Sequence, residues 1–506
     1  MAKHAPDLAL LAAPLDPASE TPLYRQLYDA LRHAILVGRF APGSRLPATR
    51  ALAAELGISR NTVAQAFDQL FAEGYLEGRV GSGTYVSRAL PDELLQADAA
   101  PTEIVPRHEP SDDGPRALSK RGRETWGLQM YAPHDLLRGI RPFVTGVPAL
   151  DAFPMETWTR LAARCWRGLP SADLGYGDPA GYGPLRKAIA ARLRDARAVR
   201  CEPEQVIIVG GTQQAIDIIA HTLINPGDTV CIEDPCYLGA SAGLTKAGAR
   251  LAPIAVDNEG LRVADARALP VQPRLVFVAP SYQYPTGVTM SLARRLALLD
   301  WARRSGVWVI EDDYDCEFRY TGRPLASLQS LDTDRRVIYV GTFSKSLLPA
   351  LRLGFLVAPA DLVDAFVAAR AVSDRHLNTL EQAVLADFIS EGHFDQHLRR
   401  MRTLYAERQA ALIEAAEHLW SGLIDIQPGH AGLHVVGRLE PGIDGKRIAR
   451  QADAAGVTSV PLSAFAVRPL RRDGLALGYA AYTPRELRKA AARLAPILEQ
   501  AHLATE

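Results

Sequence analysis

A lysine beside hydroxyl groups is the residue of this 506-residue chain best suited to covalent chemistry. In residues 336–355 an apolar run predicts a buried strand, and Lys345 follows its end together with Thr342 and Ser344. Arg352 comes seven residues after the lysine. A lone lysine after a strand is usually a solvated surface charge. Hydroxyls and a guanidinium, however, could hold a dianionic phosphate while the amine forms an imine with an aldehyde. Pyridoxal 5′-phosphate (PLP) requires this chemistry, together with a carboxylate at its ring nitrogen.

Other polar residues follow further predicted strands, as PLP chemistry would need. Gly-Gly-Thr212-Gln213 begins a helix whose free amides and positive end attract an anion. Asp312 follows an apolar strand and could hold the ring nitrogen protonated. Tyr314 could donate to the phenolic oxygen of the cofactor, and Tyr237 could stack on its ring. Taken singly, each has an ordinary alternative: a helix cap, a surface acid or a packed core tyrosine.

These polar segments all lie where a parallel sheet would bring them together. Short β-branched runs alternate with helical patterns, which predicts a largely parallel sheet covered on both faces. Ligands bind beyond the carboxyl ends of the strands in such α/β sheets. The five runs followed by polar residues are 205–209, 229–233, 274–280, 307–311 and 336–340. We therefore expect one crevice to collect the candidate residues.

The first part of the chain has a different pattern. Apolar spacing predicts one helix from Tyr24 to Gly38, a second over residues 49–56 closed by Gly57, and a third capped by Ser59. The third helix should bury Val63, Phe67, Leu70 and Phe71. Two short strands about a Gly-Ser-Gly tip follow, so the order predicts a winged helix-turn-helix.

The third predicted helix begins with side chains that can read base edges. Arg60, Asn61 and Thr62 face outward at its start, and arginine and asparagine pair with guanine and adenine. Residues 21–88 contain eight arginines, no lysine and five acids, a net charge of +3 that suits phosphate contacts. The alternative is a small helical domain with ordinary surface arginines.

Composition excludes several other classes of protein. The 57 basic and 57 acidic residues cancel, so net charge does not decide on a nucleic-acid partner. No apolar run approaches the roughly 18 residues of a membrane span, and the N-terminus lacks a signal-peptide pattern. Five cysteines without a CxxC pair indicate reduced thiols in a cytoplasmic protein, and no metal-ligand spacing is present.

Three regions are expected along the chain. Residues 18–88 form the winged helix, and residues 89–137, rich in Pro, Asp and Ala, read as an exposed linker. Basic residues at 120–123 are expected to be solvated. Residues 138–502 form the large α/β domain, with a large subdomain at about 170–358 and a smaller one at about 359–502.

The first segment, GSRLPATRALAAELGISRNTVAQAFDQLFAEGYLEGRVGSGTYV, resembles the winged-helix domain of the GntR regulators. The resemblance implies contacts with double-stranded operator DNA through residues at matching positions. It assigns DNA contacts to Arg50, Arg60, Asn61 and Thr62, a phosphate-backbone contact to Ser59 and a minor-groove tip to Gly81.

Residues from about 143 to 498 resemble fold-type I PLP enzymes of the aminotransferase superfamily. The matching motifs are LGYGDPAGYGPLR, GGTQQAID, EDPCYLG, SYQYPTG, EDDYDCEF and GTFSKSLLPALRLG. Together with the first segment, the order resembles the MocR subfamily of GntR regulators, and it implies PLP as cofactor.

By position, the resemblance makes Lys345 the Schiff-base lysine, Asp312 the partner of the ring nitrogen, Tyr314 the donor to the phenolic oxygen and Tyr237 the stacking ring. It assigns the phosphate to Thr212, Gln213, Thr342, Ser344 and Arg352. Tyr176 would reach the cofactor of a second subunit, which implies a head-to-tail homodimer.

Two departures from the aminotransferase pattern favour a regulator. Tyr284 stands before Pro-Thr-Gly where aminotransferases carry asparagine, and residues 475–480 lack the arginine that clamps a substrate carboxylate. Arg375 and Arg438 are the arginines that could replace it. The leading hypothesis is a PLP-dependent regulator that senses PLP, or its external aldimine with a small amine or amino acid. A working aminotransferase with an accessory DNA-binding domain and a DNA-binding scaffold with a vestigial crevice are the alternatives.

Overall fold

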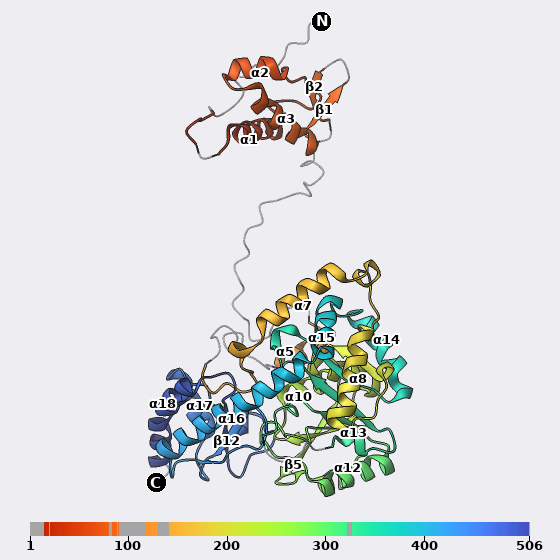
Figure 1. Cartoon of the computed structure of the whole chain (residues 1–506), viewed down its shortest axis with the longest axis vertical. Coiled ribbons are helices and arrows are strands. Elements are labelled where there is room, and N and C mark those ends of the chain that lie inside the picture. The colour runs from red at the N-terminus through yellow and green to blue at the C-terminus, as the bar shows by residue number, and fades with distance from the viewer. Residues whose placement is uncertain are drawn as a thin grey trace. The chain divides into compact units, whose positions relative to one another are not determined.

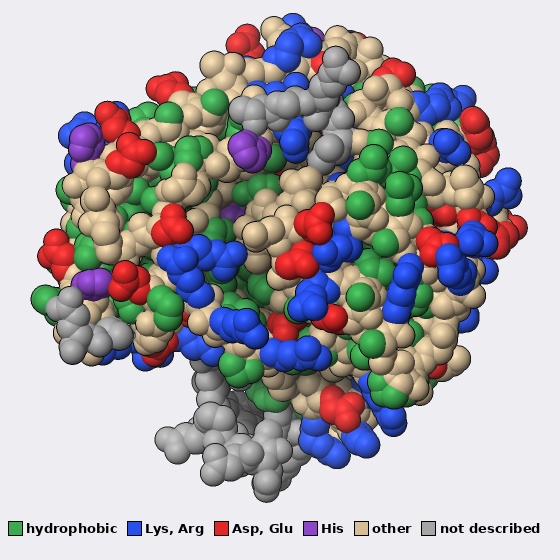
Figure 2. Space-filling model, turned by 90° about the horizontal axis from the view of Figure 1, so that it is seen from below, with side chains coloured by type: hydrophobic (Ala, Val, Ile, Leu, Met, Phe, Trp, Pro, Cys, Tyr) green, Lys and Arg blue, Asp and Glu red, His purple; other side chains and the backbone are tan. Residues whose placement is uncertain are grey.

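A computed structural model describes residues 15–19, 21–79, 83–88, 90, 118–128, 141–320 and 326–504 of the chain. The chain divides into two compact units, with the boundary after residue 115. No described helix combines the length and apolarity needed to cross a membrane. Basic and acidic side chains lie interspersed on the face shown in Figure 2, in keeping with their equal numbers in the sequence.

The described residues of the smaller unit form three helices and a two-stranded sheet (Figure 1), as predicted for a winged helix-turn-helix. Gly57 ends the second helix in the left-handed conformation (φ 64°), which glycine adopts without steric cost. The Ser59 hydroxyl caps the third helix by accepting the Thr62 N–H at 3.1 Å. The wing tip, including Gly81, lies outside the described residues. The elements are α1 Leu23–Leu36, α2 Thr49–Leu56, α3 Arg60–Ala72, β1 Leu76–Arg79 and β2 Gly83–Val86.

One predicted core residue of this unit is wrong. Val63, Phe67 and Leu70 of α3 are almost fully buried against α1 and α2, as expected. Phe71 is 37% exposed. It is one position beyond Leu70, so the 3.6-residue helical period turns it away from the α1 side and toward Gly78 of β1.

The larger unit is built on an eight-stranded sheet in the order β3-β10-β9-β8-β7-β4-β5-β6. Strands β9, β8, β7, β4 and β5 run parallel, and β10 and β6 are antiparallel to their neighbours. The prediction of a largely parallel sheet is therefore confirmed. The strands are β3 Val206–Val209, β4 Thr229–Asp234, β5 Arg250–Asp257, β6 Gly260–Leu261, β7 Leu275–Val278, β8 Trp308–Asp312, β9 Val337–Thr342 and β10 Gly354–Val357.

Helices bury both faces of this sheet, which explains why its central strands are apolar throughout. Ile207 and Val209 of β3 pack in one cluster with α9, α10 and α14, whereas Val206 and Ile208 pack in another with α8 and α15. α11 and α12 contribute to a third cluster, around β7 and β8. The helices are α7 Met155–Gly168, α8 Gly183–Arg197, α9 Thr212–Leu223, α10 Leu238–Lys246, α11 Val263–Arg267, α12 Leu292–Ser305, α13 Leu328–Leu331, α14 Val363–Ser373 and α15 Thr379–Ser390.

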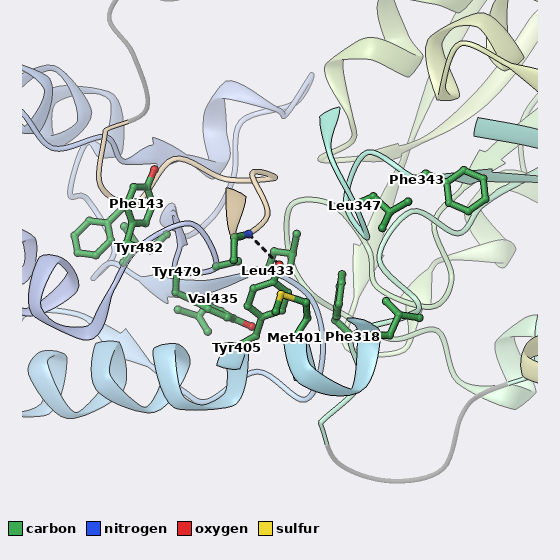
Figure 3. Packing of buried hydrophobic residues seen from close by; sticks show 14 of the residues in the cluster. Phe143, Phe318, Phe343, Leu347, Met401, Tyr405, Leu433, Val435, Tyr479 and Tyr482 are labelled. Atoms are coloured by element: carbon green, nitrogen blue, oxygen red, sulfur yellow. Dashed lines mark hydrogen bonds between the residues drawn. The ribbon is translucent and has the colours of Figure 1, made fainter. Parts of the chain in front are cut away.

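A second, antiparallel sheet lies toward the C-terminus, in the order β11-β12-β14-β13. Figure 1 shows α16, α17 and α18 gathered beside it. Figure 3 shows Met401 and Tyr405 of α16 near Phe318, and the Phe318 and Tyr405 ring centroids are 4.9 Å apart. α16 thus joins the two parts of the larger unit. The elements are α16 His393–Leu419, β11 Asp425–Ile426, β12 His434–Arg438, α17 Gly445–Ala454, β13 Val460–Pro461, β14 Gly474–Gly478 and α18 Pro484–Leu503.

The region expected to be a linker, residues 89–137, contains one described helix, α5 Lys120–Gly127. Ser119 starts it by accepting the Gly122 N–H at 3.0 Å, and α5 lies against α10. A helix this short is marginal by itself, and its polar sequence carries no apolar stripe that would signal it.

Candidate cofactor site and DNA-binding face

Lys345 lies in the turn after β9, where its amine is held by a residue distant in sequence. Its Nζ donates a hydrogen bond to the carbonyl oxygen of Gly146 at 2.8 Å. A Cβ at position 146 would lie 2.8 Å from that Nζ, and Gly146 has φ 74°, a left-handed conformation that favours glycine. Burial lowers the pKa of Lys345, against the opposing effect of Asp315 and Asp312. A lysine with a lowered pKa is more readily the neutral nucleophile that imine chemistry uses.

Asp312 and Tyr314 present buried polar atoms that lack partners. Asp312 ends β8, is only 5% exposed and acts electrostatically on Lys345. Neither its Oδ1 nor the Tyr314 hydroxyl has a hydrogen-bond partner among the described residues. Burial, reinforced by Asp313, raises the pKa of Asp312 to about 8. Leaving such groups unpaired costs about 1–3 kcal/mol each, which a ligand offering a protonated nitrogen and an oxygen would offset.

Replacing Asp312 with asparagine should flatten the pH dependence of stability of the cofactor-free protein. The buried carboxyl keeps its proton to about pH 8, whereas the unfolded chain releases it near pH 4, so the folded state binds more protons in between. The free energy of unfolding therefore falls as pH rises, by about 1.4 kcal/mol per pH unit for this one group between pH 5 and 7. Urea unfolding of both proteins at pH 5, 6 and 7 measures this difference, and equal slopes would contradict it.

The predicted phosphate-binding residues come from three turns. Gly211 (φ 108°) precedes α9, so Thr212 is the first residue of a helix whose amides point outward. The Arg352 guanidinium lies against Gly211, with both Nη atoms 3.7 Å from the position of an added Cβ. Arg352 itself has φ 49°, a left-handed conformation that is uncommon for a residue with a side chain. The buried Gln213 Oε1 has no partner among the described residues. The first two turns therefore meet, as predicted.

The third turn carries the two predicted hydroxyls. Thr342 ends β9, and its Oγ1 accepts the backbone N–H of Ser344 at 3.1 Å. β9 pairs with β10 so that Thr342 lies opposite Gly354, two residues after Arg352. The sheet thereby holds these hydroxyls near the guanidinium.

Tyr284, which replaces the asparagine of aminotransferases, is at the centre of an aromatic cluster. Its ring meets Tyr237 edge-on at 6.2 Å and Tyr314 at 6.0 Å. Its hydroxyl shares a hydrogen bond with Thr145 Oγ1 at 3.0 Å, one residue before the glycine that holds Lys345. The sequence showed Tyr284 only as a difference from the aminotransferase pattern. In the structure its ring contacts both Tyr237 and Tyr314, two of the predicted site residues.

Asp315 is a site residue that the sequence analysis missed. It is 3% exposed, its Oδ1 has no partner among the described residues, and it accepts the Leu433 backbone N–H. Burial raises its pKa to about 7, and it opposes the lowering of the Lys345 pKa more strongly than Asp312 does. Asp315 stands three residues after Asp312 in the segment EDDYD, and this closeness in sequence could have identified it as a candidate.

The adjacent Asp313 holds this segment in place. Its Oδ2 accepts hydrogen bonds from Arg197 at 2.7–2.8 Å and from the Tyr339 hydroxyl at 2.5 Å. Arg197 keeps the pKa of Asp313 low despite burial. Because this pair is buried and the Oδ2 of Asp313 accepts several hydrogen bonds, it fixes the backbone that carries Asp312 and Tyr314.

Tyr176 does not join the Lys345 cluster within one chain. It is 79% exposed, and the Arg375 guanidinium lies 3.8 Å from its ring centroid. Arg375 is therefore engaged with Tyr176. In β14, Ala476 pairs across the sheet with Val436 and Val460, so an apolar patch occupies the stretch where the carboxylate clamp was expected.

The start of α3 presents the predicted DNA-contacting side chains to solvent. Arg60 and Asn61 are exposed, as is Arg50 on α2. Arg45 is an exposed arginine that the sequence analysis missed, and its guanidinium approaches Gly83 at the base of the wing. The backbone of Arg45 pairs with Tyr85 of β2 and so places Arg45 there. The two residues are forty positions apart in the sequence, so no local pattern predicts this contact.

Two family descriptions match the chain. "Bacterial regulatory proteins, gntR family" matches residues 23–86, and "Aminotransferase class I and II" matches residues 144–494. The chain is 42% identical to the "Probable rhizopine catabolism regulatory protein MocR" of Rhizobium meliloti, over 94% of this chain and 93% of that protein. It is 35% identical to the transcriptional regulator TauR of Rhodobacter capsulatus, over 96% and 98% of the two chains.

Solved aminotransferases share the fold of the larger unit. Pyrococcus horikoshii kynurenine aminotransferase superposes with a TM-score of 0.69 at 28% identity, covering 76% of this chain and 97% of that one. LysN, the α-aminoadipate aminotransferase of Thermus thermophilus, superposes with a TM-score of 0.69 at 30% identity, covering 76% of this chain and 98% of that one. A GntR winged helix followed by an aminotransferase fold, over nearly the full length of the regulators it matches, places this chain in the MocR subfamily of GntR transcriptional regulators.

Proposed function

We propose that the protein is a PLP-dependent transcriptional regulator that senses a small amine or amino acid at Lys345. Residues 18–88 bind double-stranded operator DNA, residues 89–137 link the two domains, and residues 138–502 hold the cofactor. The observation that carries the proposal is the set of unpartnered polar atoms around Lys345, in a chain that also presents Arg60 and Asn61 at the start of a recognition helix.

The residues near Lys345 fit PLP group by group. The Asp312 carboxyl would face the ring nitrogen, the Tyr314 hydroxyl would donate to the phenolic oxygen, and Tyr237 would lie against the ring. When bound, PLP supplies an electrophilic aldehyde that reacts with primary amines. Two structural neighbours support this fit, since one was solved with PMP and the other with N-(5′-phosphopyridoxyl)-L-leucine.

The phosphate would be held by donors from separate turns. The α9 amides at Thr212 and Gln213, the hydroxyls of Thr342 and Ser344 and the Arg352 guanidinium together provide both hydrogen bonds and positive charge. Close packing of these turns would orient the cofactor so that its aldehyde meets the Lys345 amine.

A head-to-tail homodimer in the cytoplasm completes the proposal. Tyr176 is exposed, as contact with a second subunit's cofactor would require, and Trp166, Leu174 and Val372 of the larger unit are also more than 60% exposed. Large exposed apolar side chains on a soluble protein favour an interface.

Arg60→Ala is expected to weaken operator binding by roughly 10- to 100-fold, because an arginine that pairs with a base edge contributes about 1–3 kcal/mol. Fluorescence anisotropy with a DNA fragment taken from beside the protein's own gene measures this. Binding should also fall steeply with salt. Arg303→Ala, which changes an exposed arginine of α12, is the matched control. Unchanged affinity in Arg60→Ala would remove the base-contact assignment.

A working aminotransferase is the second candidate, because Lys345, Asp312 and Tyr314 are all present near one another. The apolar stretch at Ala476 disfavours it, since the substrate carboxylate would lack its bidentate partner. Turnover of amino donors at about 1 s⁻¹ or faster by the PLP-loaded protein would favour catalysis over sensing.

A further inference from the structure

A cavity of about 440 Å³ lies between the two parts of the larger unit. One wall comes from residues 282–289, which follow β7, and the other from β11, β12 and the segment between them. Its lining includes neither Lys345 nor Asp312, Tyr314 or Tyr237. Its volume falls within the range of small-molecule sites, so it can hold a ligand separately from the cofactor.

Arg438 is the permanently charged cation of this cavity's wall. It ends β12, where Val435, Val436 and Arg438 line the cavity and Val436 and Arg438 are half-buried. Its guanidinium has no hydrogen-bond or ion-pair partner among the residues that the structure describes. Burial lowers the pKa of Arg438 and Arg472 adds to that effect, whereas Asp473 and Asp425 oppose it. A half-buried guanidinium without an acceptor is costly, and a carboxylate satisfies it with two parallel hydrogen bonds.

The two threonine hydroxyls of the wall are already engaged. The Thr286 hydroxyl donates to Gln283 Oε1 at 2.5 Å, and the Thr289 hydroxyl donates to the Ser281 carbonyl at 3.2 Å. Asp425, opposite Arg438 in the sheet, lies 3.7 Å from Arg472 and is not within ion-pairing distance of Arg438. Arg472 is a second cation near Arg438, and Asp473 and Asp425 are the acids that act on it. Because these charges already balance, the site suits a single carboxylate and disfavours a dianion.

We infer that this cavity binds a small monocarboxylate through the Arg438 guanidinium. The ligand would contact both walls and therefore stabilise one arrangement of the two parts of the larger unit. The wall segment 282–289 contains Tyr284, whose ring contacts Tyr237 and Tyr314. A ligand bound in the cavity could therefore affect the cofactor site through this segment. The inference goes beyond the proposed function, because it requires neither Lys345 nor PLP.

The test measures binding of propionate and propylamine by isothermal titration calorimetry to the full-length chain. Propionate carries the carboxylate alone and propylamine the amine alone. Wild type and Lys345→Ala, both free of PLP so that no aldehyde is present to take up the amine, should both bind propionate and not propylamine. Arg438→Met should lose affinity for propionate by roughly tenfold or more, as expected for a charged hydrogen bond. Arg447→Met, which changes an exposed arginine of α17 outside the cavity, should bind as wild type does.

Folding of the variants is checked separately. Arg438→Lys keeps the charge without the planar fork and should bind with intermediate affinity. Circular dichroism and the thermal midpoint show whether each variant is folded. Absence of propionate binding to wild type, or equal binding to folded Arg438→Met or Arg438→Lys and wild type, would overturn the inference. Loss of binding in Lys345→Ala alone would place the carboxylate at the cofactor site instead and overturn it as well, while leaving the PLP proposal intact.

Discussion

Lys345→Ala should abolish the visible absorption band of the PLP-loaded protein. The Lys345 amine is held at 2.8 Å from the Gly146 carbonyl, and its pKa is lowered by burial, so it is the amine that the structure prepares for covalent chemistry. Without it, PLP would be held only by its phosphate and ring contacts. We therefore expect complete loss of the band and loss of the cofactor on dialysis.

The matched control for this prediction is another lysine of the same unit. Lys246→Ala removes an exposed amine that pairs with Asp217 at 2.8 Å, far in sequence from the Lys345 turn. Its absorption spectrum should equal that of the wild type. If Lys345→Ala keeps the band while Lys246→Ala loses it, the lysine has been assigned wrongly.

Arg352→Gly should weaken PLP binding by roughly 100-fold while leaving the fold at least as stable. Losing a guanidinium that pairs with a phosphate costs about 2–5 kcal/mol of binding. The left-handed backbone at Arg352 (φ 49°) strains any residue with a Cβ, and glycine relieves that strain by about 1 kcal/mol. Strained backbone conformations cluster at functional sites, so the strain at Arg352 is consistent with a role in binding rather than in stability.

Two measurements separate binding from stability for this position. Equilibrium dialysis gives the dissociation constant of PLP, and urea unfolding gives the free energy of unfolding. Arg352→Lys should recover part of the affinity through its charge. Arg335→Gly is the control, because Arg335 has a similar φ of 54° but follows Asp334 in the turn before β9, away from the phosphate donors. Equal PLP affinity in Arg352→Gly and Arg335→Gly would contradict the phosphate assignment.

Local patterns predicted much of the winged helix and of the cofactor turns. Helix α2 has the predicted bounds 49–56, and Ser59 caps α3, because caps and apolar periods are properties of a few consecutive residues. The strand ends were also local signals. Asp312 and Thr342 each end a buried strand, so the parallel sheet brings them to one edge.

Other features depend on contacts between distant residues, which no local pattern shows. The Lys345 amine donates its hydrogen bond to the carbonyl of Gly146, and the Asp315 carboxylate accepts one from the backbone N–H of Leu433. The exposure of Phe71 depends on how α3 packs against α1 and β1. The helix α5 was missed since its sequence lacks an apolar stripe, and it lies against α10. Tertiary contacts decide each of these.

The most direct test of the central claim couples the cofactor site to DNA binding in one experiment. The affinity for a DNA fragment from beside the protein's own gene is measured for PLP-free and PLP-loaded protein, in the wild type and in Lys345→Ala. Coupling between two sites typically changes affinity by about 5- to 150-fold. We predict a change of that size on loading the wild type and none in Lys345→Ala. Equal DNA affinity in all four samples would contradict the claim that this chain senses its ligand through Lys345.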